Sequence, residues 1–124
     1  MNLVDSCGWL EYFADGPNAG FFAPTIEAPE QLLVPTLCVL EVFKSLCRQR
    51  DENAALKAAA IMAQGLSADL DQATALAAAR LGAELKLPLA NSVILATARR
   101  FGAVLWTQDA DFKGMTGVKY TPKR

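Results

Sequence analysis

Short apolar runs alternate along this chain with longer stretches in which apolar residues recur at helical spacing. The runs lie at residues 2–4, 31–34 and 103–107, and residues 118–120 form a weaker one. Runs of this length that are apolar throughout are typical of strands covered on both faces of a parallel sheet. The alternation therefore predicts strands separated by helices, and the helices are expected at residues 6–13, 20–28, 36–50, 51–64, 71–87 and 88–101.

Capping and breaking residues set the boundaries of these helices. Thr36, Asp51 and Asp71 are suited to cap three of them, and Gly65 is suited to end one. Pro88 separates the last two helices and fits the first turn of the second. Residues 66–70 are at most a short strand. In the helix at 71–87 the spacing predicts one shared face, formed by Leu76, Ala79, Ala83 and Leu87.

Strands that alternate with helices predict an α/β fold, a three-layer α/β/α sandwich around a mainly parallel sheet with right-handed crossovers. The 124 residues contain no evident linker or repeat, so we expect one domain, residues 1–124. Ligands of such sheets bind beyond the carboxyl ends of the strands. Asp5 and Asp109 both follow an apolar run directly, which places them at that edge.

The amino-acid composition restricts the chemistry that an active site in this chain could use. The chain has no histidine, so hydrolysis would depend on carboxylates, a lysine or a metal ion. Its three cysteines lack Cys-x-x-Cys spacing, which disfavours a disulfide framework and a zinc site and indicates ordinary buried or half-buried thiols. A net charge of −1 excludes strong nucleic-acid binding by the whole surface but allows a local basic patch. With no secretion signal and no membrane span in the sequence, we expect a cytoplasmic protein.

Each polar candidate has an ordinary structural explanation when taken alone. Asp5 is suited to cap the first helix, and Asn91 to cap its own helix, although Asn91 also shares a face with the apolar residues that follow it. Glu41 lies on a polar stripe and could pair with Lys44, a contact worth about 0.2–0.5 kcal/mol. The alternative is that Glu41 is a metal ligand, with Lys44 and Arg48 contacting phosphates. Asp109 and Asp111 are also common turn residues.

Taken together, these acids predict a metal site. Asp5, Glu41, Asp109 and Asp111 come from three separate segments, and Asn91 is directed toward the same edge of the sheet. Clustered carboxylates repel one another unless a cation lies between them. Mg²⁺ and Mn²⁺ prefer carboxylate oxygen and water, and suit a site without histidine or thiolate. An ion held in this way can generate hydroxide and stabilise charge on a phosphodiester.

Four segments resemble the PIN-domain ribonucleases, and among them the VapC-type toxins of bacterial toxin–antitoxin pairs. They are Leu3-Val4-Asp5-Ser6, Leu40-Glu41-Val42-Phe43-Lys44, residues 87–98, and Thr107-Gln108-Asp109-Ala110-Asp111-Phe112. The resemblance spans the chain and implies a Mg²⁺- or Mn²⁺-dependent endoribonuclease that cleaves RNA. It also implies a homodimer that is inhibited by an antitoxin whose tail enters the active-site groove.

Carried over by position, Asp5, Glu41, Asp109 and Asp111 match acids of the family's metal site. The catalytic candidates are Asp5, Glu41, Asn91 and Asp109. The expected RNA contacts are Ser6, Lys44, Arg48 and Thr107.

Position 91 departs from the family pattern, which has Asp where this chain has Asn. The exchange keeps the shape of the side chain and removes a charge, and loss of one such preorganised group costs roughly 2.7–4 kcal/mol, about 10²–10³ in rate. We therefore expect impaired activity, whether the exchange was introduced to spare a host or occurs naturally. A non-catalytic module that binds antitoxin and dimerises is the first alternative. A phosphatase-like phosphotransfer enzyme is disfavoured because no second acid lies two residues after Asp5.

Overall fold

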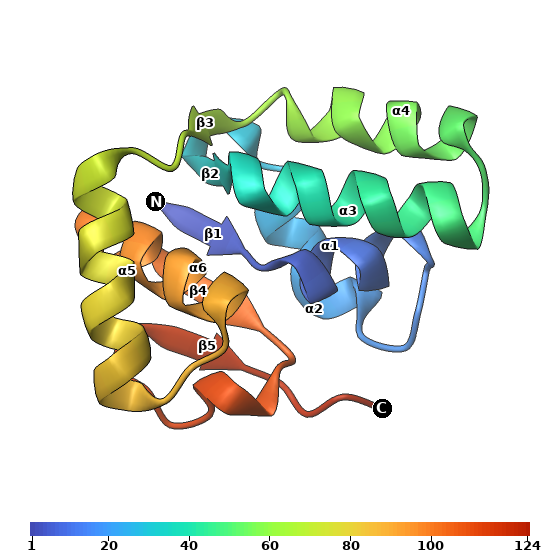
Figure 1. Cartoon of the computed structure of the whole chain (residues 1–124). Helices are drawn as coiled ribbons and strands as arrows, with labels where there is room; N and C mark the ends of the chain where they lie inside the picture. The colour runs from blue at the N-terminus through green and yellow to red at the C-terminus, as the bar shows by residue number, and fades with distance from the viewer.

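Five short parallel strands form the centre of the computed structural model, which describes all residues 1–124 (Figure 1). The middle strand is β1 (Asn2–Val4), in which Leu3 lies opposite Leu33 on one side and opposite Leu105 on the other. The expected parallel sheet is confirmed, and the doubtful segment at 66–68 is one of its edge strands. The order across the sheet is β3 (Leu66–Ala68), β2 (Leu32–Pro35), β1, β4 (Val104–Thr107) and β5 (Val118–Tyr120).

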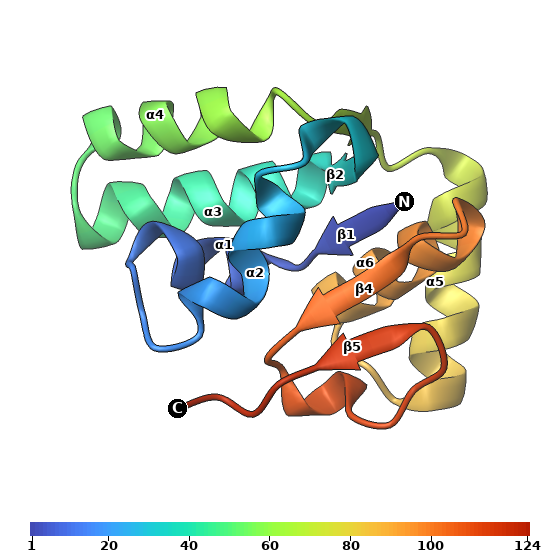
Figure 2. The same cartoon turned by 180° about the vertical axis from the view of Figure 1, so that it is seen from behind.

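Six helices cover the two faces of the sheet, as expected for an α/β/α sandwich. Figures 1 and 2 show α5 and α6 on one face of β4 and β5, and α2 on the other. The helices are α1 (Ser6–Phe13), α2 (Ala19–Ile26), α3 (Thr36–Gln49), α4 (Glu52–Met62), α5 (Gln72–Leu85) and α6 (Leu89–Arg100), with short 3-10 turns η1 (Pro29–Gln31) and η2 (Ala110–Phe112). None of these helices combines the length and the apolar composition that crossing a membrane requires.

Three aspartates cap helices as their sequence positions predict. Asp5, Asp51 and Asp71 accept hydrogen bonds from backbone N–H groups in the first turns of α1, α4 and α5, at 2.8–2.9 Å. Two other expected caps are wrong. Helix α3 begins at Thr36 after Pro35, and α6 begins after Pro88, in both cases without a side-chain cap. The Asn91 amide is therefore free to make contacts outside its own helix.

The packing of α5 and α6 differs from the predicted amphipathic faces. Helix α5 buries Thr74 and Ala78, whereas Leu76 is 57% exposed, so the expected Leu76 face is wrong. Helix α6 is buried on every side from Ser92 to Ala98, because α5 covers the side that the sheet leaves open. The two helices approach closely at Gly82, where an added Cβ would lie 2.5 Å from the Ser92 hydroxyl.

The core centres on β1 and its neighbouring strands. Leu3, Val4 and Leu105 have no exposed surface, and Trp9 and Phe22 fill the space between the sheet, α1 and α2. The three cysteines are free thiols, of which Cys38 is buried, Cys7 is half-buried and Cys47 is exposed, so the expectation of burial is wrong for Cys47. This rigid centre holds the carboxyl ends of β1 and β4 side by side, and the candidate site lies there.

Candidate active site

A cavity of about 290 Å³ opens at the carboxyl ends of β1 and β4. Asp5 enters it directly after β1, Glu41 from α3, Asn91 from the first turn of α6, and Asp109 from the second position after β4. The structure thus brings these four predicted residues to one place from four separate elements. The remaining lining residues are Ser6, Cys7, Leu10 and Ile94.

Asp5 is the most enclosed of the acids. One of its carboxylate oxygens accepts a hydrogen bond from the backbone N–H of Gly8 at 2.9 Å, and the Thr107 hydroxyl donates to the other. Burial raises the pKa of Asp5 above its ordinary value; these hydrogen bonds oppose the rise, and the charge of Asp109 adds to it. An acid held in this state gains from a cation placed beside it.

Thr107 links Asp5 to Asp109. Its hydroxyl donates to Asp5 and accepts a 2.9 Å hydrogen bond from the backbone N–H of Asp109. Its side chain has no exposed surface. The expectation that Thr107 contacts RNA is therefore wrong, and its contacts are those of a residue that positions two acids.

The Asn91 side chain joins the two acids that follow β4. Its amide nitrogen donates to Asp109 Oδ2 at 3.1 Å and to Asp111 Oδ2 at 3.2 Å. Asp109 also caps η2 by accepting a 2.9 Å hydrogen bond from the backbone N–H of Asp111. Asp111 is exposed and does not line the cavity, so it lies at the rim rather than with the other three acids.

Ser6 orients Glu41, because its hydroxyl donates to Glu41 Oε1 at 2.5 Å. Glu41 makes no ion pair with Lys44, and the chain's single ion pair joins Arg100 to Asp71, so the alternative of a Glu41–Lys44 pair is wrong. Glu41 is shared with a neighbouring groove that Lys44 and Arg48 also line. The two exposed cations therefore lie beside the acid cavity.

Cys7 is a site residue that sequence reasoning missed. Its thiol lies 3.2 Å from both carboxylate oxygens of Asp5, and burial together with the Asp5 charge raises its pKa strongly. Cys7 is consequently a protonated donor to Asp5 rather than a thiolate ligand. Cys7 lies two residues after the capping acid Asp5, in the first turn of α1, and this spacing could have indicated its contact with Asp5.

The residues of the cavity fit a hard divalent cation. No three His, Cys, Asp or Glu side chains lie close enough together to form a ligand cluster by themselves. Mg²⁺ does not require such a cluster, because it keeps several waters and is commonly held by one or two carboxylates. Asp5 and Asp109, with Glu41 across the cavity, supply oxygen donors only, which suits Mg²⁺ or Mn²⁺.

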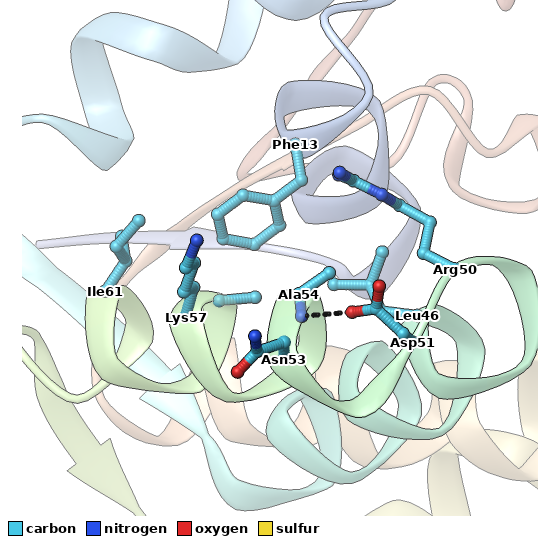
Figure 3. A pocket seen from close by; sticks show the side chains of 9 residues that line it. Phe13, Leu46, Arg50, Asp51, Asn53, Ala54, Lys57 and Ile61 are labelled. Atoms are coloured by element: carbon cyan, nitrogen blue, oxygen red, sulfur yellow. Dashed lines mark hydrogen bonds between the residues drawn. The ribbon is translucent and has the colours of Figure 1, made fainter.

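A second hollow, of about 250 Å³, lies between the end of α1 and the hairpin of α3 and α4 (Figure 3). Phe13, Leu46 and Ile61 form apolar parts of its wall, and Arg50 and Lys57 carry its positive charges. Its one acid, Asp51, is occupied in capping α4, as the dashed line in Figure 3 shows. The hollow contains none of the predicted site residues.

Comparison with known proteins places the chain in a family and identifies solved structures with the same fold. Residues 3–118 match the family described as PIN domain. The structure is similar to a toxin–antitoxin complex from Klebsiella pneumoniae, with 25% sequence identity and a TM-score of 0.82 over 99% of this chain and 98% of the other. No curated protein sequence matches the chain.

Two further solved structures share the fold. VapC20 from Mycobacterium tuberculosis, described as a sarcin-ricin loop cleaving toxin, has 19% identity and a TM-score of 0.77 over 94% of this chain and 95% of that one. VapBC2 from Rickettsia felis, bound to a DNA fragment from its promoter, has 11% identity and a TM-score of 0.74 over 98% of this chain and 97% of that one. These comparisons lend no support to a phosphatase-like enzyme.

Proposed function

The chain belongs to the PIN domain family, and from this premise we propose that it is a metal-dependent endoribonuclease toxin whose activity Asn91 impairs. The convergence of Asp5, Glu41 and Asp109 with the Asn91 amide on one cavity carries the proposal. An oxygen-lined space of this kind suits a divalent metal ion that acts on an RNA phosphodiester.

Asp5 and Asp109 are the residues that would hold the ion, with Glu41 facing them across the cavity. A bound Mg²⁺ or Mn²⁺ supplies a hydroxide nucleophile and stabilises negative charge on a phosphodiester. Other residues of the chain orient these carboxylates. Thr107 fixes the carboxylate of Asp5 relative to the backbone of Asp109, and Ser6 fixes Glu41.

Lys44 and Arg48 are the proposed contacts for the RNA backbone on the α3 side of the cavity. Both are exposed, neither makes an ion pair, and both line the groove that shares Glu41 with the acid cavity. Ser6 lines the acid cavity and donates to Glu41, which both spaces share, so we keep it as an RNA-contact candidate. We also propose that the protein acts on RNA in the cytoplasm.

Asn91 weakens this site in two ways. It lacks the negative charge of an aspartate, and its amide hydrogens are directed at Asp109 and Asp111, where a cation would be favoured. Asn91→Asp should therefore raise Mg²⁺- or Mn²⁺-dependent RNA cleavage by about 10²–10³. Cleavage of labelled RNA, with and without EDTA, measures the change, and calorimetric titration with Mn²⁺ measures ion binding separately.

Asn53→Asp is the matched control, because it adds the same charge on α4, beside the second hollow. This variant should leave both measurements unchanged. Equal inactivity of the wild type and Asn91→Asp, with Mn²⁺ bound in neither, would contradict the nuclease proposal. That outcome would favour the alternative of a non-catalytic binding module, which the Asn91 contacts to two acids also fit.

We further propose that an antitoxin segment covers the acid cavity. The structural neighbours include toxin–antitoxin assemblies, and the cavity is open enough to admit a side chain between Glu41 and Asp109. A basic side chain is favoured there because the lining acids outnumber the cations. Such an inhibitor would compete with the metal ion and the RNA for the same carboxylates.

A second copy of the chain is the proposed partner of an apolar groove between α5 and α6, which contains neither Lys44 nor Arg48. Leu89 at the start of α6 is 85% exposed, and Leu70 is also exposed beside it. Leucines exposed together on one surface are typical of protein interfaces. The groove is lined by Leu70, Ala75, Ala78, Ala79, Gly82, Ala83, Leu89, Ser92 and Val93.

A further inference from the structure

The last twelve residues carry a concentration of positive charge that the site described above does not use. Residues 113–124 contain Lys113, Lys119, Lys123 and Arg124 and no acid, in a chain whose net charge is −1. All four cations are exposed, and none makes an ion pair. Their charges are therefore available to a partner.

Backbone pairing places this segment beside the acid cavity. The N–H of Thr121 donates to the carbonyl of Thr107 at 3.1 Å, directly beyond β5. Thr107 itself contacts Asp5 and Asp109. The C-terminal segment thus leaves the sheet at the edge where the acids lie, and Figures 1 and 2 both show it on the opposite side of β1 from α3.

A buried amide fixes the position of the segment. Asn18, which is 3% exposed, donates from Nδ2 to the carbonyl of Pro122 at 3.0 Å and to Gln108 Oε1 at 2.8 Å. Gln108 lies between Thr107 and Asp109 in the chain. Asn18 holds the carbonyl of Pro122, so Lys123 and Arg124 extend from a point that is linked through Asn18 to Gln108, the neighbour of Asp109.

An aromatic ring accompanies the cations on this side. Tyr120 is half-buried at the end of β5, and the Lys113 ammonium lies 6.0 Å from its ring centroid. Cations combined with an accessible ring are the usual means of holding single-stranded nucleic acid, because phosphates bind the charges and bases stack on the ring.

Lys119 lies apart from this group. Its ammonium is 4.8 Å from the ring centroid of Trp106, and the Trp106 indole donates to Asn2 at the amino end of β1. Asp5 follows the other end of that strand, about 10 Å away at ~3.3 Å per residue. Lys119 is therefore a control position, because it is an exposed cation of the same C-terminal segment but lies on β5, away from the acids.

We propose that Lys113, Lys123 and Arg124, with Tyr120, form a second RNA-contact surface, which we call the C-terminal basic surface. The inference rests on the proposed nuclease function, since it supplies the contact on the side of the cavity opposite Lys44 and Arg48. An RNA strand that crosses the cavity meets cations on both sides, which offsets the repulsion between its phosphates and the site acids. A cationic surface beside an acid cavity, with a ring among its charges, favours RNA over an acidic protein segment.

The test measures binding without cleavage. A short fluorescein-labelled RNA hairpin with a single-stranded loop is titrated with wild type and with the triple variant Lys113→Ala, Lys123→Ala, Arg124→Ala, in EDTA and at several salt concentrations. Each lost phosphate contact lowers the slope of log affinity against log salt by ~0.7 for single-stranded nucleic acid, so loss of all three should lower it by about 2. Lys119→Ala should retain the wild-type slope, and Tyr120→Leu should weaken binding without changing the slope.

Three outcomes distinguish the possibilities. A reduced slope in the triple variant alone supports the C-terminal basic surface. If the triple variant keeps the wild-type affinity and the wild-type slope, the C-terminal basic surface is overturned and the nuclease proposal stands. The cations would then serve an acidic protein partner or only offset the field of the site acids. Absence of RNA binding by the wild type, together with no cleavage by Asn91→Asp, overturns both proposals.

Discussion

Asp5 has a position that suits the candidate site but disfavours the stability of the fold. It caps α1 through Gly8 and forms the innermost wall of the acid cavity, yet its carboxylate is almost completely buried. Burial of a charge without a cation costs folding free energy, which hydrogen bonds from Thr107 and Cys7 reduce only in part. The metal-free protein therefore keeps this carboxylate at the expense of its stability.

Asp5→Asn should stabilise the protein near neutral pH in the presence of EDTA. The raised pKa of Asp5 means that the folded state holds its proton more tightly than the unfolded chain, so folding loses free energy as the pH rises from the ordinary value of 3.8 through the raised value. The asparagine keeps the Gly8 cap and has no charge to bury. Urea unfolding at a series of pH values measures the effect.

The advantage of Asp5→Asn should disappear below the ordinary pKa of aspartate, where the wild-type carboxyl is protonated in both states. A constant difference across the whole pH range would show that the effect arises from packing rather than from ionisation.

At the residue scale, the sequence predicts which acids meet but not how they are held. Asp5 and Asp109 follow apolar strands, so their convergence can be read from the pattern alone. The Thr107 and Asn91 contacts depend on the register between β1 and β4 and on the rotation of α6, which no local pattern encodes. For that reason the sequence predicts that Thr107 contacts RNA and that Asn91 belongs to the site, but it does not predict that these side chains hold Asp5, Asp109 and Asp111.

The helices are predicted most accurately where a capping acid marks their start. Asp51 and Asp71 define α4 and α5 because a carboxylate that satisfies a first-turn N–H is a local feature. The buried face of α5 was predicted wrongly because the helix is rich in alanine, and small apolar residues occur on all its sides. Tertiary packing against α6 then selected Ala78 rather than Leu76.

Close contact between elements makes Gly8 sensitive to substitution. An added Cβ would lie 2.6 Å from Val4 Cγ1 and 2.7 Å from Phe22 Cε1. This overpacking should lower the free energy of unfolding of Gly8→Ala by about 1–3 kcal/mol. The better helix propensity of alanine offsets up to ~1 kcal/mol of that loss. Urea denaturation measures the change.

Gly20→Ala is the control for Gly8→Ala, because Gly20 is also helical and an added Cβ there meets nothing within 4 Å. It should be neutral or stabilising by up to ~1 kcal/mol. Equal effects of the two substitutions would show that helix propensity, rather than the contact of α1 with β1 and α2, determines the loss.

On the scale of the whole molecule, the exposed leucines predict association. Leu89→Lys places a charge in the groove proposed for a second copy and should convert a dimer into a monomer, as measured by analytical ultracentrifugation. Leu56→Lys is the control, since Leu56 on α4 is also an exposed leucine, at 53% against 85% for Leu89, and lies outside this groove. A wild-type protein that sediments as a monomer at all concentrations would contradict the proposed dimer.

The central position of β1 determines when the candidate active site can form during synthesis. Asp5 is translated among the first residues, but its cavity closes only when β4 pairs with β1 and brings Thr107 and Asp109 beside it. A nascent chain on the ribosome therefore has no assembled site until residues 104–111 have emerged, and a product terminated before them carries none.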